Sequence, residues 1–212
     1  MSATTSKAEK NSLLEILDAG GGRITLGKPL SKDEFVTLSE RFSDLQMERE
    51  ANGKTNISLP LKKGAAERES TLILWIGLWA MESKTGTFFS SSIGIELPDG
   101  SIKSPDCAWV SDERLADFPE NDDDEYLRVI PDFVAEVRSS SDRLPPLKRK
   151  MEKTWMANGV RLAWIDPYNE KVYIYRQGQE VEEVKGFAGK MLSGENVMPG
   201  MELPLEELRR NN

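Results

Sequence analysis

Three side chains of this sequence, two carboxylates and one lysine, are candidates for catalysis. Asp106 lies inside a predicted strand, Glu136 near the end of the next predicted strand, and Lys150 in the helix predicted after it. A strand–strand–helix order can place two carboxylates and an ammonium group around one point. Two carboxylates hold a hard divalent cation, which polarises a phosphodiester and lowers the pKa of its bound water. A nearby lysine stabilises the charge that develops on phosphorus or orients the attacking water.

The residue types that the sequence lacks narrow the chemistry further. The 212 residues include no histidine and one cysteine, Cys107. Ser-His-Asp and Cys-His mechanisms, histidine-containing zinc sites and nuclease motifs with a histidine base are therefore excluded within this chain. Carboxylates remain as the metal ligands to expect, and they suit Mg²⁺, Mn²⁺ or Ca²⁺. A single cysteine forms no internal disulfide, and neither a signal-peptide-like segment nor a membrane span is visible, so we expect a cytoplasmic protein.

The charge of the chain is negative overall but unevenly distributed. A net charge of −8 argues against a protein that coats nucleic acid, because such binding depends on neutralising phosphates. Residues 117–125 hold six acidic side chains and no basic one, whereas residues 143–153 hold five basic side chains against Glu152 alone. The basic stretch, which includes Lys150, could still face a polyanion.

Hydrophobic periodicity predicts the elements that must position these residues. Residues 69–84 have apolar side chains at helical spacing. Residues 87–97 and 101–110, around a turn at Pro98-Asp99-Gly100, indicate a β-hairpin. The apolar residues 129–137 indicate a buried strand, and Pro145-Pro146 begin a basic helix that Gly159 ends. The remaining predicted elements are a short helix near Leu13–Leu17, a helix opened by a Ser31–Glu34 capping box and carrying Phe35, strands within 45–61 around Asn52-Gly53, strands at 160–165 and 171–176, and a short helix at 205–210.

Each candidate residue also has a structural interpretation. If the strand at 129–137 alternates, Phe133, Ala135 and Val137 face one side and Glu136 the other, together with Val134 and Arg138. A carboxylate inside an apolar strand is costly unless it is paired or bound to a metal, so a Glu136–Arg salt bridge is the alternative.

The other candidates have comparable alternatives. Pro105-Asp106 is often only a turn, and Lys150 stands in a lysine-rich run that is typical of a solvated face. Asp132 fits a capping or supporting role better than a ligand. The five tryptophans fit the core better than base stacking, and Cys107 fits a buried, inert thiol.

A series of short motifs, in this order and spacing, resembles the Uma2 family of the PD-(D/E)xK nuclease superfamily. These motifs are Ser104-Pro105-Asp106, Val110-Ser111, residues 131–139, Lys150-Met151, residues 158–164 and Asp166-Pro167. The resemblance runs from about Leu30 to Arg176. It implies an α/β (mixed α+β), restriction-endonuclease-like fold with a mixed central sheet flanked by helices, and Mg²⁺-dependent nuclease chemistry.

The resemblance also implies roles for individual residues. Asp106 matches the aspartate of the PD pair and Glu136 matches the acidic residue of (D/E)xK. Arg138 occupies the usual lysine position, and Lys150 matches the lysine that moves to the following helix in Uma2-like chains. Two further glutamates are auxiliary candidates: Glu48, before an early turn, and Glu69, at the start of the long helix.

The sequence departs from the family pattern at two places. Trp164-Ile165-Asp166-Pro167 is one residue shorter than is usual, and a one-residue loss reverses the facing of a strand unless a bulge absorbs it. Thr154-Trp155 stands where a glutamate and an aromatic residue are more usual. The first departure concerns a strand that supports the sheet, and the second lies in the helix that carries Lys150.

We therefore expect one domain, residues 30–205, between an N-terminal tail with a short helix (1–29) and a C-terminal tail (206–212). The expected function is an endonuclease that hydrolyses phosphodiester bonds of nucleic acid, DNA before RNA, with Mg²⁺ or Mn²⁺ held by Asp106 and Glu136. The alternative is a catalytically silent nuclease-fold module for binding or assembly, which the charge of −8 and the shortened segment favour. A homodimer stays open, and no membrane partner is expected.

Overall fold

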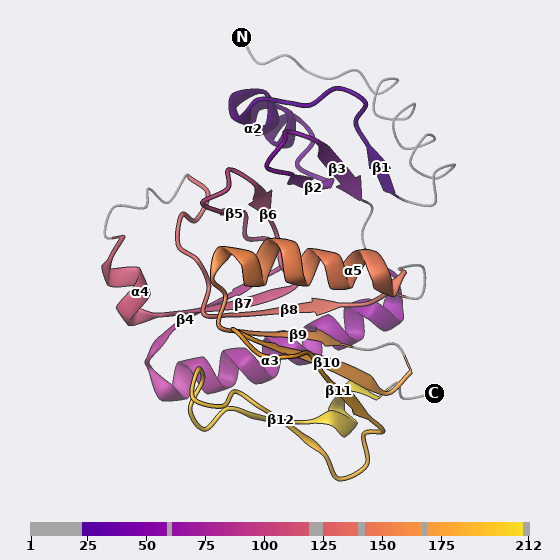
Figure 1. The fold of residues 1–212 in the computed structure, drawn as a ribbon, viewed down its shortest axis with the longest axis vertical. Coiled ribbons are helices and arrows are strands. Elements are labelled where there is room, and N and C mark those ends of the chain that lie inside the picture. The colour runs from indigo at the N-terminus through magenta and orange to yellow at the C-terminus, as the bar shows by residue number, and fades with distance from the viewer. Residues whose placement is uncertain (1–22, 59–60, 119–124, 140–142, 167–168, 210–212) are drawn as a thin grey trace. The chain divides into compact units, whose positions relative to one another are not determined.

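The computed structural model describes the whole chain apart from residues 1–22, 59–60, 119–124, 140–142, 167–168 and 210–212 (Figure 1). The chain divides into two compact units, Met1–Pro60 with Pro98–Lys103, and Leu61–Leu97 with Ser104–Asn212. The predicted helix near Leu13–Leu17 and the predicted turn residues Pro167-Tyr168 lie outside the described residues.

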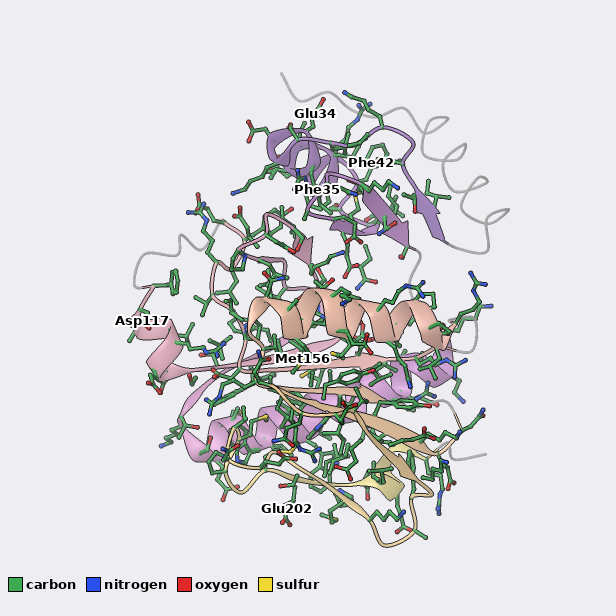
Figure 2. The ribbon with its side chains drawn as sticks, viewed as in Figure 1. Glu34, Phe35, Phe42, Asp117, Met156 and Glu202 are labelled. Carbon is green, nitrogen blue, oxygen red and sulfur yellow. The ribbon has the colours of Figure 1, made fainter. Side chains whose placement is uncertain are left out.

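The described residues of the smaller unit form one helix and four short strands. Its sheet has the order β1-β3-β2-β6, with antiparallel neighbours, and its elements are β1 (Arg23–Thr25), α2 (Lys32–Arg41), β2 (Gln46–Arg49), β3 (Thr55–Ser58) and β6 (Ile102–Lys103). The predicted capping box is confirmed, because Ser31 Oγ accepts the Glu34 N–H at 3.2 Å and Glu34 Oε2 accepts the Ser31 N–H at 2.8 Å. Glu34 and the fully buried Phe35 belong to the first turn of α2 (Figure 2). The predicted turn at Asn52-Gly53 joins β2 to β3, with Gly53 at φ 84°.

The larger unit is built on a six-stranded sheet of order β11-β10-β9-β8-β7-β4. Only the β8–β9 pair is parallel among the strand pairs described in this sheet. The strands are β4 (Gly86–Ser90), β7 (Cys107–Ser111), β8 (Phe133–Val137), β9 (Leu162–Asp166), β10 (Lys171–Arg176) and β11 (Glu182–Lys185). The other elements are α3 (Lys63–Ser83), β5 (Ile95–Glu96), α4 (Asp112–Ala116), α5 (Leu144–Lys150), a π-helical turn (Met151–Trp155), a 3-10 turn (Met156–Asn158), β12 (Met191–Ser193), β13 (Glu202–Pro204) and a 3-10 turn (Leu205–Leu208).

Helices α3 and α5 lie on opposite faces of this sheet (Figure 1). Alternation along each strand divides the core into two apolar clusters, as the pleat of a strand requires. One cluster joins α3 and the C-terminal segment to Phe133, Ala135 and Val137 of β8. The other joins the π-helical turn to Val134 of the same strand. The predicted alternation of β8 is therefore confirmed, and Glu136 belongs by its position to the α5 face.

The predicted strand 101–110 is wrong as one continuous strand. It is two strands, β6 and β7, separated by Ser104-Pro105-Asp106, and β6 pairs with β2 while β7 pairs with β4. Proline has no N–H to donate to a ladder, so a sheet is interrupted there more easily than elsewhere. The turn at Pro98-Asp99-Gly100 is present, and Asp99 Oδ1 accepts the Ser101 N–H at 2.9 Å.

Other boundaries differ by several residues. Helix α3 begins at Lys63, before the predicted Glu69, and β8 begins at Phe133 because Pro131-Asp132 precedes it. Gly159, at φ 98°, ends the helical segment after α5 as predicted. The predicted C-terminal helix is the single 3-10 turn Leu205–Leu208, whose two leucines are buried in the core.

The shortened Trp164–Pro167 segment does not disturb the strand that carries it. β9 pairs with β8 without interruption from Phe133↔Leu162 to Val137↔Asp166. Among the helices of the described part of the chain, none has the length and apolar character that crossing a membrane requires.

Candidate active site

The register between β7 and β8 places Asp106 opposite Glu136. Cys107 pairs with Ala135 and Ala108 with Val134 in an antiparallel ladder, so the continuation of this register sets position 106 against position 136. Directly opposed residues of antiparallel strands point to the same face, with Cβ atoms about 4.5–5.5 Å apart. The structure therefore brings the two predicted carboxylates together at the α5 face of the sheet.

Glu136 is buried and its carboxylate is held from the helical side. Its side chain is 5% exposed, and Oε1 accepts from Lys150 Nζ at 2.7 Å and from Trp155 Nε1 at 2.7 Å. The cation that contacts this carboxylate oxygen is Lys150 of α5. Because a buried carboxylate is costly without such partners, this arrangement accounts for a charged side chain in the middle of an apolar strand.

The surroundings of Asp106 disfavour its ionised form. Its carboxyl Oδ2 accepts the N–H of Val137 at 2.5 Å, which ties it to the strand that bears Glu136. Loss of hydration raises the pKa of Asp106 well above its usual range, and the negative charge of Glu136 raises it further. The Val137 hydrogen bond and the Lys150 charge oppose this shift in pKa without cancelling it.

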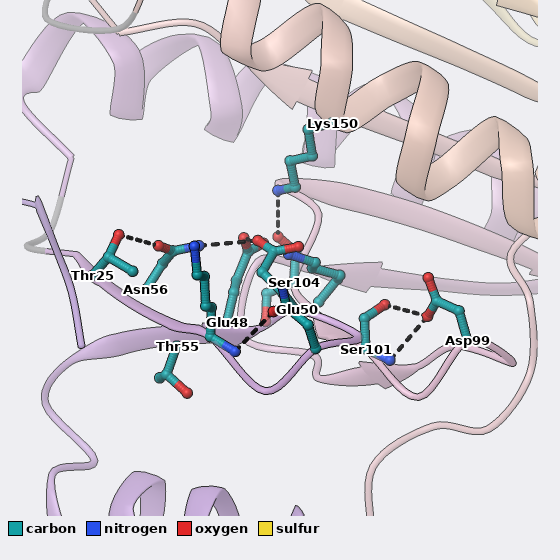
Figure 3. Close-up of polar contacts among 12 residues, drawn as sticks. Thr25, Glu48, Glu50, Thr55, Asn56, Asp99, Ser101, Ser104 and Lys150 are labelled. Atoms are coloured by element: carbon teal, nitrogen blue, oxygen red, sulfur yellow. Dashed lines mark hydrogen bonds and ion pairs between the residues drawn. The ribbon is translucent and has the colours of Figure 1, made fainter. Parts of the chain in front are cut away.

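Lys150 lies at the C-terminal end of α5 and reaches back toward the loop before β7. Its side chain is 20% exposed, and its Nζ lies 3.5 Å from the carbonyl oxygen of Ser104, as Figure 3 shows. The ammonium therefore contacts the segments that carry both carboxylates. The structure places Asp106, Glu136 and Lys150, which the sequence indicates as one group, close to one another.

The auxiliary residues of the larger unit have different surroundings. The Glu69 carboxylate accepts a hydrogen bond from the Ser91 hydroxyl, and its charge contributes to the raised pKa of Asp106. The backbone carbonyl of the half-buried Arg138 accepts from Arg68 Nη2 of α3 at 2.6 Å. Glu69 is thus near enough to influence the pair electrostatically, and Arg138 fastens the end of β8 to α3.

Glu48 belongs to the smaller unit, where a buried lysine counters its charge. Lys103 Nζ lies 2.6 Å from Glu50 Oε1 and 3.7 Å from Glu48 Oε2, and Asn56 Nδ2 donates to the same Glu50 oxygen at 3.0 Å. Figure 3 shows this network together with Thr25, whose hydroxyl donates to Asn56. Glu48 therefore lies beside the buried Lys103 in an ion network that also includes Glu50.

Asp132 supports the frame of the site, as predicted from its position. It is fully buried, its Oδ2 accepts the Ser111 N–H at 2.9 Å, and its Oδ1 lies 3.1 Å from both Arg114 and Arg161. One aspartate thus links the end of β7, the start of β8 and the approach to β9. Cys107 is buried as predicted, and burial raises the pKa of its thiol, so it stays protonated.

Trp155 is a partner of Glu136 that the sequence does not reveal. It is fully buried, as expected of a core residue, but its indole N–H also donates to the carboxylate. Lys150 and Trp155 lie five residues apart in one predicted helix. Whether side chains at this spacing point to the same side depends on the backbone geometry of the helix, which the sequence does not show.

The donor set fits a divalent cation of the magnesium type. Among the residues that the structure describes, no group of three or more acidic or thiol side chains is gathered for a metal. Mg²⁺ commonly takes only one or two protein carboxylates and completes its octahedron with water and phosphate oxygens. The opposed carboxylates of Asp106 and Glu136 match this number of protein ligands.

The mixed sheet between two helices, with this carboxylate pair and lysine at one face, defines a restriction-endonuclease-like nuclease fold. A crystal structure from Anabaena variabilis, described as "a putative nuclease belonging to DUF820", superposes with a TM-score of 0.69. It shares 18% sequence identity, and the match covers 85% of this chain and 97% of that chain, which supports the fold.

A family model for Uma2, described as "Putative restriction endonuclease", matches residues 33–206. The chain therefore belongs to the Uma2 family. None of the curated proteins matches it.

Proposed function

We propose that this protein is a divalent-metal-dependent endonuclease that hydrolyses phosphodiester bonds of DNA. The observation that carries the proposal is the opposed pair of Asp106 and Glu136, with Lys150 Nζ 2.7 Å from the Glu136 carboxylate. The nuclease fold and the family description support the reaction class.

Each residue has a role that its surroundings allow. Asp106 and Glu136 would hold Mg²⁺ or Mn²⁺, which when bound supplies a polarised phosphate and a water of lowered pKa. Lys150, already ion-paired, acts as a positive charge that stabilises the phosphorane-like transition state rather than as a base. Asp106 would hold the cation in its ionised form, because carboxylate ligands bind metals when they are deprotonated. Glu69, hydrogen-bonded to Ser91, adds negative charge that favours the cation.

One observation favours the alternative, a catalytically silent module. Glu136 is satisfied by Lys150 and Trp155 without any metal, so the trio is also a stable structural arrangement. Metal binding separates the two readings, because a silent scaffold needs none.

Cleavage of supercoiled plasmid, linear DNA and RNA by the full chain, with Mg²⁺ or Mn²⁺, tests the proposal. Lys150→Ala should lower the turnover number by about 10²–10³-fold, the effect of removing one transition-state donor, while Mn²⁺ binding persists. Lys150→Arg should recover part of the rate, because the charge remains. Lys148→Ala is the matched control: its ammonium lies 3.8 Å from the centre of the Tyr173 ring, and its loss should leave the rate near wild type.

Two outcomes would contradict this assignment. A wild-type chain that neither binds Mn²⁺ nor cleaves any of the three substrates is a silent module. Near wild-type turnover in Lys150→Ala, together with a folded but inactive Arg138→Ala, would show that Arg138, directly after β8, supplies the catalytic cation.

A further inference from the structure

Trp155 differs from the other indoles of the sheet core in having a charged partner. Trp109, Trp155 and Trp164 are all buried. Within the described structure, the indole nitrogens of Trp109 and Trp164 have no hydrogen-bond partner, whereas that of Trp155 donates to Glu136 Oε1 at 2.7 Å. A hydrogen bond to an ionised acceptor in a dry environment is among the stronger kinds.

The same carboxylate oxygen is also ion-paired with the ammonium of Lys150, which precedes Trp155 by five residues. In a regular α-helix, residues five apart point about 140° away from each other, because each residue turns the helix by about 100°. Here the segment Met151–Trp155 is a π-helical turn, closed by the Met156 N–H to the Met151 carbonyl. The wider turn brings positions 150 and 155 toward one side, and π-turns of this kind occur frequently at functional sites.

We propose that Trp155 is a positioning residue for the active site and that the π-helical turn exists to place it. The inference rests on the proposed function. Two donors of different character hold Glu136 Oε1: Lys150 is partly exposed at the end of a flexible side chain, whereas Trp155 is rigidly packed in the core. When the Lys150 ammonium turns to a substrate phosphate, the indole keeps the carboxylate in the orientation that a metal requires. Outer partners of metal ligands act in this way.

The experiment compares two substitutions of buried tryptophans in the full-length chain. Trp155→Phe removes the donor to Glu136 and some volume, whereas Trp164→Phe removes a similar volume and an indole nitrogen without a partner. Mn²⁺ affinity is measured by calorimetry, and kcat and KM are measured on DNA. Trp155→Phe should weaken Mn²⁺ binding by about 10–100-fold, the range for lost outer-shell partners, and lower kcat more than it raises KM. Trp164→Phe should leave the Mn²⁺ affinity unchanged.

A second variant keeps the test independent of packing. Benzothienylalanine at position 155 keeps the shape of tryptophan and replaces the N–H by sulfur, so it should repeat the loss of Mn²⁺ affinity in a normally folded protein. Wild-type Mn²⁺ affinity in this variant would overturn the positioning role while leaving the proposed function intact. A wild-type chain that binds no Mn²⁺ and cleaves nothing would overturn both.

Discussion

Asp106 and Glu136 are chemically alike, but their surroundings differ. Glu136 has an ammonium and an indole N–H on one oxygen, whereas Asp106 has a backbone N–H and the negative charge of its neighbour. Burial and the negative charge of Glu136 therefore favour a proton on Asp106 in the metal-free protein. A cation would replace that proton, so metal affinity should rise with pH.

The raised pKa of Asp106 makes its removal favourable to the metal-free fold. A carboxyl whose pKa is higher in the folded than in the unfolded chain binds more protons when folded, so wild-type stability falls as pH rises from its usual pKa to the raised one. Asp106→Asn cannot titrate, and its amide oxygen can still accept the Val137 N–H. Metal-free Asp106→Asn should therefore be as stable as wild type or more stable at neutral pH, with the advantage vanishing in acid.

The same variant should lose the stabilisation that metal provides. Wild type should gain about 2.7 kcal/mol at a free Mn²⁺ concentration of 100 times Kd, and Asp106→Asn should gain little. Thermal unfolding between acid and neutral pH, with and without Mn²⁺, measures both effects. Asp117→Asn, at an exposed position, is the control. A metal-free Asp106→Asn that melts far below wild type would mean that Asp106 is a structural residue.

At the scale of elements, the sequence predicted the features that have a local sequence pattern. The alternation of β8, the capping box of α2 and the glycine stop after Asn158 each leave a local pattern, and each is present. Strands β11 to β13 were missed because they are only three or four residues long, so no periodicity marks them in the sequence. Their partners are neighbours along the chain, because β11 pairs with β10 and β12 pairs with β13.

The candidate site likewise has residues that the sequence indicates and one that it does not. Asp106, Glu136 and Lys150 follow from residue type, order and the family pattern, and the ladder register explains why two strands suffice to bring them together. The contribution of Trp155 follows from one π-helical turn, which changes the facing of side chains without changing their spacing in the sequence. Likewise, the interruption at Ser104–Asp106 depends on which strand each half meets.

The contact between β4 and β7 gives a prediction about packing. A Cβ at Gly86 would lie 2.2 Å from the Val110 carbonyl oxygen and 2.8 Å from the Trp109 ring, so the strands would have to move apart. Gly86→Ala should destabilise the fold by about 1–3 kcal/mol, as other overpacked positions do. For a chain of this size, that corresponds to a melting temperature lower by about 2–4 °C per kcal/mol.

Gly27→Ala is the control for this measurement by thermal unfolding. Nothing lies within 4 Å of a Cβ at Gly27, and its φ is not in the left-handed region, so this variant should melt like wild type. Equal melting temperatures for Gly86→Ala and wild type would show that β4 and β7 are farther apart than in this structure.

At the scale of the whole molecule, the net charge of −8 opposes binding to a polyanion. The helical segment that carries Lys150 is the exception, because Arg149 and Lys153 are exposed there. Within the described part of the chain, neither takes part in an ion pair. A nuclease with this charge distribution should bind DNA through that segment, with Lys150 next to a phosphate.

Charge reversal on this segment tests the approach. Each phosphate contact releases counterions, so the slope of log Kobs against log salt concentration should be about one unit shallower for each lost contact. Arg149→Glu and Lys153→Glu should weaken binding uniformly across DNA sequences. Each is made in the Asp106→Asn background, which we expect not to cleave DNA. Lys185→Glu on β11, a reversal of another exposed lysine, should leave the slope unchanged, because it lies on a different element. Fluorescence anisotropy of labelled DNA over a salt series measures all three, and equal slopes for every variant would mean that DNA meets another surface.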